Sequence, residues 1–451
     1  MATSNDYVLE RTANQIIESA LRRARIIPVE QSISDSDRDT ALEALNNMIK
    51  RFQAKGYMLW KQEEYILPTE KGKQSYYVGA SGDRCALADT FIFSELSAAV
   101  TAAATQITIA DTSDFTGADN VLTFDPTDAV ADWSTTDGTL AAITAGLRLT
   151  STVPASEGYT EYTFTDQATI GREYFFQVDV DSLGIDNVRL EVYDVGLTTT
   201  LNASEVISAT GEQVIRFTPE QNTIIFRFVN EDTTGAQVSE FSNLQLRDTT
   251  TGETIGIYIS NALREWNSVT RVIDGTTLEL LNAQTNDAAS AASVWAFKNL
   301  PPRPLAVNLM RSIRNSDTNE IPVNQWSRSE YMEQVNKTSE GLITQAYYQP
   351  TLTNGRLYVW QVSDSVNQYM RFNAFLPIQV FNESLDEPDF PSEWFDALSW
   401  NLAAEIAPEY GVPLDRQQYL EQKAAVTLGE PEDWDEEQGS LYIGVRRNAQ
   451  N

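Results

Sequence analysis

Apolar residues recur at helical spacing in two adjacent segments near the end of the chain. In residues 389–411, four apolar side chains recur at every fourth position and so share one face of a helix: Trp394, Leu398, Leu402 and Ile406. A second helical run, 414–428, repeats this spacing with Leu420, Ala424 and Leu428. Pro391 suits the first turn of the first helix, and Gly429 is expected to end the second. This helical hairpin cannot bury its apolar stripe alone and therefore needs a partner.

The beginning of the chain carries two further helical patterns that can supply this partner. The first, 12–25, stops before Pro28 and places five apolar residues on one side: Ile16, Ile17, Ala20, Leu21 and Ala24. The second ends at Gly56 and has the inward series Leu42, Leu45, Ile49 and Phe52. Because the two helical hairpins have no other helical partner, residues 12–56 are expected to pack against residues 390–428.

Between these ends, the pattern changes to the two-residue period of strands. Residues 57–77 alternate and are rich in aromatic residues, which indicates strands around a turn at 70–73, although such a run is typical of an ordinary sheet face. Short strand-like runs follow at 105–109 and 255–259. Residues 269–281 resemble a hairpin whose turn is Asp274-Gly275.

The segment 121–254 has a composition of its own. It contains no Lys and 6 Arg against 21 Asp and Glu, a net charge of −15. Its expected strands come at regular intervals: 159–164, 174–180, 188–195, 214–217, 223–229 and 241–246. Regular short strands of this kind are typical of a β-sandwich or a jelly roll.

The sequence therefore predicts an α+β protein in which the domains are nested. It has a discontinuous helical domain from both chain ends, a β-rich domain, and an inserted β-sandwich that is jelly-roll-like. The expected boundaries are 1–60 with 388–430 for the helical domain, 61–120 with 255–387 for the β-rich domain, 121–254 for the sandwich, and 431–451 for a C-terminal extension.

Composition excludes several kinds of function. The chain has 64 acidic and 32 basic residues, a net charge of −32, which argues against a protein that binds nucleic acid by displacing counterions. The absence of His removes Ser-His-Asp and Cys-His catalysis and every imidazole metal site. Cys85 is the only thiol, so no disulfide forms within the chain. We expect no enzymatic activity, no cofactor, no metal site, no signal peptide and no membrane span.

Several stretches, taken in order, resemble the head-to-tail adaptor proteins of short-tailed bacteriophages, the group that includes packaged-DNA stabilisation proteins and tail tubular protein A. The resemblance rests on ALRRARIIP (20–28), DTALEALNNMIKRFQAKGYMLW (39–60), RPLAVNLMRSIRN (303–315), SRSEYMEQVNK (327–337), GRLYVWQV (355–362) and DFPSEWFDALSWNLAAEIAPEYG (389–411). It covers roughly residues 8–118 and 255–445. For residues 121–254, which depart from the smaller members of the group, it implies nothing.

The resemblance implies a structural protein of the virion neck, made in the cytoplasm of the host bacterium. Such adaptors form a homo-oligomeric ring, commonly of twelve copies, that joins the portal ring to the tail nozzle protein and helps to retain packaged DNA. DNA passes through the lumen without specific binding, and no membrane is involved.

Two groups of residues are candidates for portal or subunit contacts. Trp394 and Trp400 lie on different sides of their helix, so one is expected in the core and the other, Trp400, at a subunit contact. After Gly429 the chain becomes acidic and then carries a strand-like run and two arginines. This tail can add a strand to a partner through Trp434, Leu441, Tyr442, Ile443, Arg446 and Arg447, or it can be a frayed terminus.

The insertion leaves an alternative function open. Asp132-Trp133 and residues 241–248 are loosely similar to the edges of carbohydrate-binding jelly rolls, in which exposed aromatic rings stack on sugars. Trp133 and Tyr159 are therefore candidate glycan-binding residues of a decorating β protein that is attached to the particle through its helical ends. The competing interpretation places Trp133, Tyr159, Tyr162, Phe175 and Phe176 in the core of the sandwich.

Overall fold

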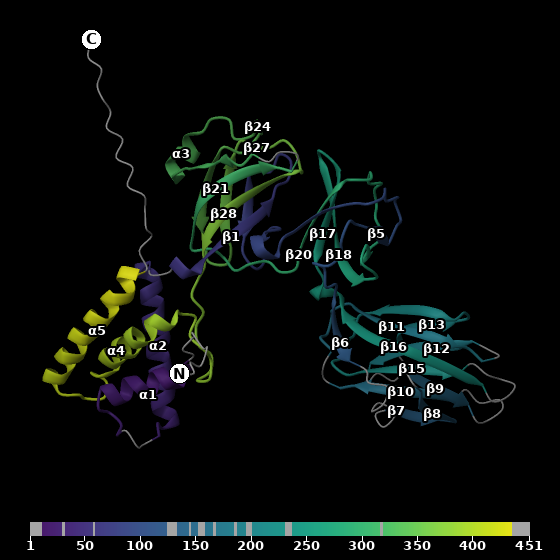
Figure 1. Ribbon diagram of the computed structural model, residues 1–451, viewed down its shortest axis with the longest axis horizontal. Coiled ribbons are helices and arrows are strands. Elements are labelled where there is room, and N and C mark those ends of the chain that lie inside the picture. Colours follow the sequence, from purple (N-terminus) through teal and green to yellow (C-terminus); the bar gives the residue numbers. More distant parts are fainter. Residues whose placement is uncertain are drawn as a thin grey trace, which may run out of the picture.

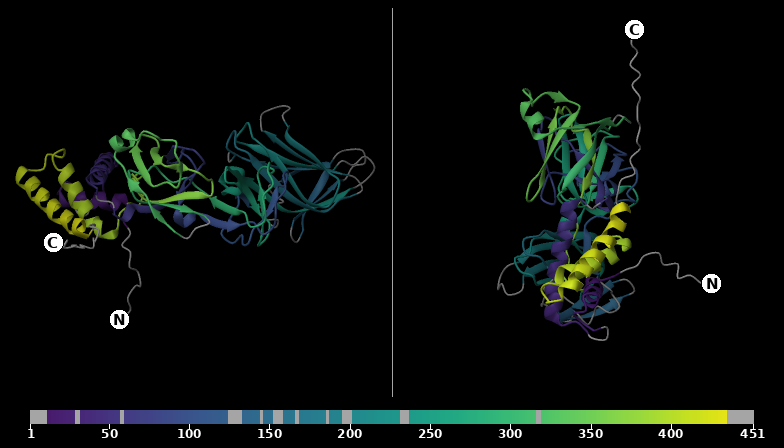
Figure 2. Two further views of the ribbon diagram at one scale, coloured as in Figure 1. Left: turned by 90° about the horizontal axis from the view of Figure 1, so that it is seen from above. Right: turned by 90° about the vertical axis from the view of Figure 1, so that its left-hand side faces the viewer.

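The chain forms an elongated molecule in which most of the described elements are strands (Figures 1 and 2). The computed structural model describes residues 11–28, 32–56, 59–123, 133–143, 146–151, 158–165, 168–184, 187–194, 201–230, 237–315 and 319–434. A helical body, two β bodies and a β-sandwich follow one another along the long axis. The predicted α+β fold is confirmed in its coarser part: the described residues form several sheets, among them a β-sandwich, together with helices.

The helical body contains segments from both ends of the chain. Its helices are α1 (Ala13–Arg23), α2 (Asp35–Lys55), α4 (Phe395–Ile406) and α5 (Leu414–Trp434). They share one apolar core, in which Ile17, Leu45 and Leu402 are fully buried. The apolar stripe of α4, formed by Leu398, Leu402 and Ile406, lies at the centre of this core, and α1, α2 and α5 all contact α4.

The helix ends differ in part from those expected. Ser34 caps α2 by accepting a hydrogen bond from the Asp37 N–H (3.1 Å), and Gly56 follows with φ 94°, a left-handed conformation that favours glycine. Gly429 does not end α5, which continues to Trp434. A helical glycine costs only about 1 kcal/mol relative to alanine, and Pro431 removes a single N–H donor near the end of the helix.

A linker of residues 376–390 joins the helical body to the β bodies and lies along α2. The Asn46 side chain makes two hydrogen bonds of 2.9 Å to the backbone of Phe381. The Lys50 ammonium donates to the Ile378 carbonyl at 2.7 Å. The ring of Phe390, at the end of the linker, packs against the Trp60 ring with the centroids 5.2 Å apart. The linker is therefore fastened by specific polar contacts as well as by aromatic packing.

The first β body consists of two main sheets. One has the order β22 (Ile321–Pro322), β21 (Ala306–Arg314), β28 (Gln368–Phe375), β1 (Gln62–Pro68) and β3 (Ala86–Leu87). The other has the order β2 (Ser75–Val78), β26 (Gly355–Trp360), β25 (Gln345–Pro350) and β23 (Asn324–Gln325). A small parallel pair, β24 (Glu340–Gly341) and β27 (Val362–Ser363), and the helix α3 (Arg328–Glu333) complete this body.

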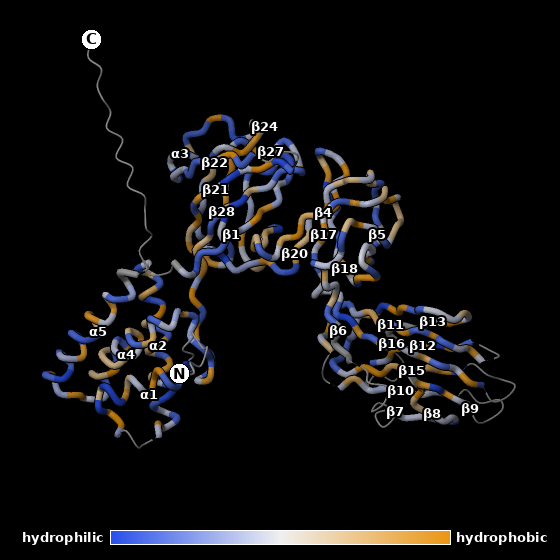
Figure 3. Tube along the Cα trace, viewed as in Figure 1, coloured by the Kyte–Doolittle hydropathy of each residue, from blue (hydrophilic) through white to orange (hydrophobic). Residues whose placement is uncertain are grey.

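The two main sheets enclose an apolar core with Tyr65, Tyr76, Leu357 and Phe372 at its centre. Along β28, buried and half-buried positions alternate. Figure 3 colours the chain by hydropathy, and hydrophobic and hydrophilic positions are interspersed along the strands of the β bodies. The strands on either side of the turn at 70–73 do not pair with each other. β1 pairs with β28 whereas β2 pairs with β26, because the turn carries the chain from one sheet to the other.

The second β body is a single six-stranded sheet that curves around its own core. Its order is β4 (Ile92–Glu95), β20 (Ser293–Phe297), β17 (Thr254–Ser260), β18 (Leu263–Val272), β19 (Thr277–Leu280) and β5 (Gln106–Thr108). All of its pairs are antiparallel, and Ile107, Ile255, Val269 and Leu278 fill the core. β18 and β19 form the hairpin expected around Asp274-Gly275.

The insertion is a sandwich of two antiparallel sheets. One has the order β13 (Leu201–Ile207), β12 (Val188–Asp194), β15 (Ile224–Asn230), β10 (Gly158–Phe164) and β7 (Trp133–Thr136). The other has the order β14 (Gly211–Phe217), β11 (Tyr174–Ser182), β16 (Val238–Asp248), β9 (Gly146–Ser151) and β8 (Gly138–Ile143), and β6 (Asp119–Thr123) also pairs with β16. Phe176, Phe226, Phe228 and Phe241 stack between the two sheets.

Glu253 fixes the point where the sandwich leaves the second β body. Its buried carboxylate accepts hydrogen bonds from the Thr116 N–H (2.9 Å), the Thr116 hydroxyl (2.6 Å) and the Gly117 N–H (3.0 Å). The Thr251 hydroxyl accepts from the Asp119 N–H at 2.7 Å. The two chain crossings therefore lie side by side, which is the geometry of a domain carried on one loop.

Candidate functional site

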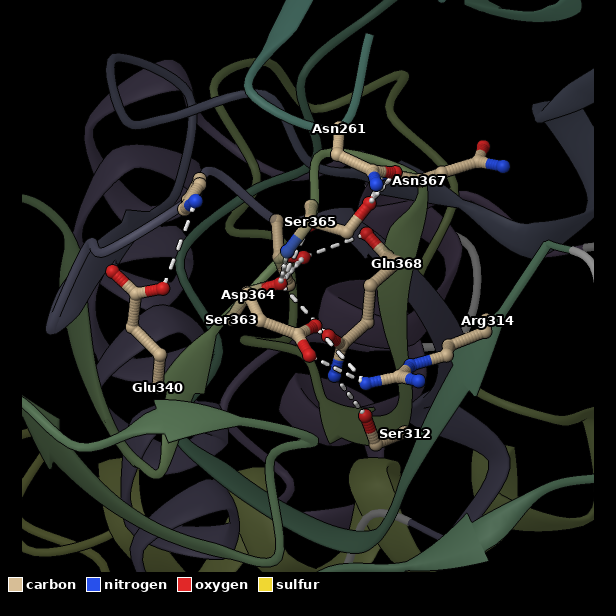
Figure 4. Close-up of polar contacts among 11 residues, drawn as sticks. Asn261, Ser312, Arg314, Glu340, Ser363, Asp364, Ser365, Asn367 and Gln368 are labelled. Carbon is tan, nitrogen blue, oxygen red and sulfur yellow. Dashed lines mark hydrogen bonds and ion pairs between the residues drawn. The ribbon is translucent and has the colours of Figure 1, made fainter.

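A buried polar network joins the two β bodies (Figure 4). The Ser363 hydroxyl lies 2.6 Å from the Ser365 carbonyl oxygen and 2.8 Å from Gln368 Oε1. Gln368 Nε2 in turn donates to the Ser312 hydroxyl at 2.7 Å. Ser363, Gln368 and Ser312 are fully buried. Each polar group is satisfied by another, so the network holds the segment 363–368 in one conformation.

The same segment contacts the second β body. The Val366 N–H donates to the Asn261 carbonyl at 3.0 Å, and Asn367 Oδ1 accepts from Arg264 Nη2 (3.0 Å) and from the Ser293 hydroxyl (2.9 Å). At the rim, Arg314 binds Asp364 through two contacts of 3.0 and 2.7 Å. These contacts hold the segment 363–368 against the second β body.

A pocket of about 260 Å³ opens beside this joint. It is lined by the turn after β1, the hairpin between β17 and β18, and the side chains of Arg84 and Val366. Arg264, on β18, lies at its buried end with only 6% of its surface exposed. The Arg84 guanidinium lies at the open end, 4.7 Å over the Trp266 ring. Two guanidinium groups and an indole therefore meet in one cavity.

A second polar cluster lies on the outer face of the sandwich sheet that contains β15. Arg227 is ion-paired with Glu161 (2.8 Å) and lies over the rings of Tyr159 (4.4 Å) and Tyr193 (4.7 Å). The Tyr193 hydroxyl donates to Glu191, and burial, together with this hydrogen bond, raises the pKa of Tyr193 to about 12. The cluster combines aromatic rings, a cation and two carboxylates on one sheet face.

Trp400 lies on the outer side of α4. Its ring is half-buried, with the Arg23 guanidinium 4.5 Å from its centroid and the Tyr419 ring 6.2 Å away. Arg23 also pairs with Asp396, one turn before Trp400. Trp394 is 3% exposed and lies in the core of the helical body. The two tryptophans therefore differ in environment, as their spacing on the helix predicts.

Among the remaining candidate residues, the prediction for Trp133 is corrected, and the side chains of those near the C-terminus lie outside the described part of the chain. Trp133 is wrong as a glycan-binding residue: it is 7% exposed, and its ring packs on Tyr162 (5.4 Å) and Phe228 (5.7 Å) inside the sandwich. Its strand, β7, lies at the edge of the sheet. The indole points inward, where the large apolar ring is shielded from water. Tyr159 lies on the outer face. The Trp434 side chain and Leu441, Tyr442, Ile443, Arg446 and Arg447 lie outside the described residues.

Sequence reasoning missed the polar joint and the pocket. Arg264 lies inside a strand-like run and looks like an ordinary surface cation, and 363–368 looks like an ordinary polar turn. The signal that was available is the density of Ser, Asn and Gln in SDSVNQ, next to two apolar strands. Only the fold shows that this turn is buried between two bodies.

The described residues contain no group of three or more His, Cys, Asp and Glu arranged to hold a metal ion. None of the described helices is both long and apolar enough to cross a membrane.

Comparison with known proteins gave three outcomes. No family model matches the chain, and no curated protein matches it. Solved structures that resemble part of it include one described as "CBM4 structure and function", with 14% identity over 27% of this chain and 97% of that chain and a TM-score of 0.23. Another is the family 11 carbohydrate-binding module from Clostridium thermocellum in complex with a mixed-linked tetrasaccharide (10% identity, 28% and 94% covered, TM-score 0.21). A third is the enzymatically active domain of bacteriophage CBA120 tailspike protein 4 (10% identity, 29% and 21% covered, TM-score 0.23).

Proposed function

We propose that this chain is a structural protein of a short-tailed bacteriophage virion. In this proposal, copies of the chain form a ring, of twelve copies as in the group that the sequence resembles, between the portal ring and the tail nozzle protein. The ring helps to retain packaged DNA, which passes through its lumen without specific binding. The role requires no catalysis and no cofactor.

One observation carries this proposal: the helical body, which holds both ends of the described chain, lies at one end of an elongated molecule (Figure 1). A connector needs two separate surfaces, one for each neighbour. The helical body supplies one, and the β bodies at a distance supply another. The stretches on which the sequence resemblance rests lie in the helical body and the first β body, and the sandwich is carried on a single loop of the second β body.

The proposed contact with a neighbouring subunit or the portal runs through the outer side of α4 and the C-terminal residues. Trp400 fits such a contact because its ring is half-buried beside Arg23 and Tyr419, in a cluster of the kind that becomes an interface hot spot when covered. The residues after Trp434 complete the proposed contact.

The particle mass tests this proposal. The purified chain is measured by native mass spectrometry, alone and after mixing with a purified portal ring. A ring of twelve 50.3 kDa chains has a mass of about 600 kDa. The expected result is such a ring, free or added to the portal mass. A chain that stays at 50.3 kDa in both samples would contradict the proposal.

A second candidate function is glycan binding by the sandwich, favoured by the outer-face cluster of Tyr159, Arg227 and Tyr193. Aromatic rings and charged groups on one sheet face provide both stacking surfaces and hydrogen-bond partners for sugars. In this reading the chain decorates the particle, and its helical ends serve for attachment.

The second candidate is tested with the full chain and two probes, a soluble β-glucan and bacterial lipopolysaccharide. We expect the affinity for a probe to fall at least about tenfold in Tyr159→Ala and to be unchanged in the control variant Tyr419→Ala on α5. Absence of binding to either probe, or equal loss in both variants, would remove this candidate.

A further inference from the structure

The pocket between the two β bodies has an unusual balance of charge. Its lining includes Arg84, Arg264 and Lys71 but only one acidic residue, Glu70. The whole chain carries a net charge of −32, so a pocket with a cationic excess runs against the average of the molecule. Lys71 lies 3.7 Å from Glu340 at the rim, whereas the two arginines lie inside the pocket and at its mouth.

Arg264 is a buried cation whose partners are all neutral. Its Nη1 donates to the carbonyls of Gly256 (2.9 Å) and Ser293 (3.2 Å), and its guanidinium lies 3.5 Å over the Trp295 ring. Among the described residues no carboxylate pairs with it. Burial lowers the pKa of Arg264 to about 9, so it remains charged at neutral pH. A buried charge without a counter-ion is costly, and an anion beside it would offset that cost.

Arg84 supplies the second cation, and its donors are available. Its guanidinium stacks on Trp266 but donates no hydrogen bond to a described residue. The two carboxylates close enough to affect it, Glu70 and Asp83, both bind Lys73 instead, at 2.9 and 2.7 Å. Arg84 therefore lines the pocket with N–H donors that no described residue accepts, and a planar oxyanion matches such a guanidinium fork.

The remaining walls of the pocket decide which oxyanion fits. Trp266, Leu263, Val366 and Pro68 give it apolar sides between the two arginines. A glutamate side chain has a carboxylate at one end and an apolar stem that these walls can cover. Phosphate has no apolar part, and a polyanion such as DNA is repelled by the net negative charge of the chain.

We propose that this pocket binds an acidic side chain, glutamate above all, that is presented by a peptide segment of a partner protein. Arg84 holds the carboxylate with its guanidinium fork, Arg264 supplies the buried positive charge, and the apolar side chains of Leu263, Val366 and Pro68 cover the stem. The site is independent of ring formation, because every residue that forms it belongs to one copy of the chain.

The test uses the full chain and a fluorescein-labelled peptide, glycine-glutamate-glutamate-glycine, with blocked ends. Anisotropy measures its binding, and the same peptide with both glutamates replaced by glutamine is the matched probe. Arg84 is exposed, so Arg84→Ala should fold normally, and Arg328→Ala on α3 is the control variant. The expected result is that the acidic peptide binds, that Arg84→Ala weakens binding at least about tenfold, and that Arg328→Ala leaves it unchanged.

Three outcomes would overturn the proposal. The glutamine peptide binds as tightly as the acidic one, or Arg84→Ala retains full affinity, or inorganic phosphate displaces the peptide at equal concentration. The last outcome would assign the pocket to phosphate groups instead. A variant with Arg84→Lys separates charge from geometry: because lysine keeps the charge but loses the fork and the stacking, it should bind with intermediate affinity. None of these outcomes depends on whether the chain forms rings.

Discussion

At the scale of single residues, Glu265 of the second β body is a carboxylate that accepts four hydrogen bonds. Its Oε1 accepts from the Thr285 N–H (2.6 Å) and hydroxyl (2.7 Å), and its Oε2 accepts from the N–H (3.1 Å) and the side-chain amide (3.0 Å) of Asn286. Burial alone would raise the pKa of Glu265, but these four donors outweigh it and lower the pKa below its ordinary value. The residue therefore fastens the loop after β19 to β18.

The first prediction is that Glu265→Gln loosens this loop. In glutamine, an NH2 group replaces the carboxylate oxygen that accepts from Asn286, so donors face donors. We therefore expect the free energy of unfolding of this loop to fall by about 1 to 3 kcal/mol. Because the folded state lowers the pKa, the carboxylate stabilises the fold above its ordinary pKa of 4.5, and this contribution is lost as the pH falls through the lowered value.

Hydrogen exchange at the Thr285 and Asn286 amides measures this directly. Exchange should be faster in Glu265→Gln at pH 7, and the difference from the unmodified chain should shrink in acid. Glu333→Gln, an exposed position on α3, is the matched control. Equal protection of the two amides in Glu265→Gln and in the control would contradict the prediction.

Sequence alone says little at this scale, for physical reasons. The apolar positions of the helices could be predicted because burial follows a period, and Leu398 and Leu402 are indeed fully buried. The roles of Arg264 and Glu265 could not, because each depends on partners far away in the chain. Trp133 is a further example of what sequence alone does not settle. An aromatic residue at the start of a strand points inward or outward depending on the register of that strand, and Trp133 points inward.

At the scale of elements, α4 is the centre of the helical body, because it contacts each of the other three helices. Its stripe of Leu398, Leu402 and Ile406 is fully buried. The Ser399 hydroxyl donates to the Phe395 carbonyl at 2.9 Å, so even the buried polar group of this face is satisfied within the helix.

The second prediction is that Leu402→Ala destabilises the helical body. A fully buried leucine reduced to alanine loses packing and leaves a cavity, so the expected loss in the free energy of unfolding is about 2 to 5 kcal/mol. Urea unfolding followed by circular dichroism at a helical wavelength gives this value. Val426→Ala on α5 is the control, since that side chain is 61% exposed and should change stability by less than about 0.5 kcal/mol. A loss below about 1 kcal/mol in Leu402→Ala would show that α4 is not at the centre of a packed core.

The sequence predicted some elements and not others, and the difference follows from their residues. The strands β10, β11, β12 and β15 are rich in aromatic and β-branched residues, and their predicted bounds are close to the observed ones. The prediction does not include β6, β7, β8, β9 and β13. Short runs with small residues, such as GTLAAI in β8, carry only a weak strand pattern. The pairing of β1 and β2 could not be derived, since a turn sequence does not say whether its strands remain in one sheet.

At the scale of the whole molecule, the boundary of the sandwich is set by contacts and not by composition. The change in composition suggested residues 121–254, but Glu253 binds Thr116 and Gly117 and therefore belongs to the second β body. Across the boundary, Arg271 pairs with Glu212 of the sandwich and with Glu279 of its own body, so it keeps a partner if the sandwich is removed.

The third prediction is that the sandwich can be excised if the cut respects this boundary. Replacing 120–251 by a short Gly-Ser turn should leave the helical body and both β bodies folded, because the ends already lie side by side and a short loop closes them at low entropic cost. A chain in which 121–254 is replaced also lacks Glu253, so its free energy of unfolding should be lower by about 1 to 3 kcal/mol than that of the chain in which 120–251 is replaced. Thermal unfolding of the two shortened chains compares them. Equal stability would mean that Glu253 has no structural role, and insolubility of both would mean that the sandwich is part of the core architecture.

The fourth prediction concerns the C-terminal extension. Since α5 continues to Trp434, the deletion should begin at 435. Removing 435–451 should leave the helical body folded, because Leu428, the last described residue of α5 in the apolar core, lies before the cut. The same deletion should abolish attachment to the portal, and the double change Arg446→Glu with Arg447→Glu should weaken attachment in a salt-dependent way. Co-sedimentation with a portal ring at two salt concentrations measures both. Full portal binding by the shortened chain would move the attachment site to the helical body itself.

The central claim is that the chain is a ring-forming connector, and electron microscopy of the chain mixed with a purified portal ring tests it most directly. The account predicts portal particles that carry one additional ring on a single face. The helical bodies should lie near the portal axis, and the sandwiches should project outward. Portal rings that look the same with and without the chain, beside free single copies, would contradict it.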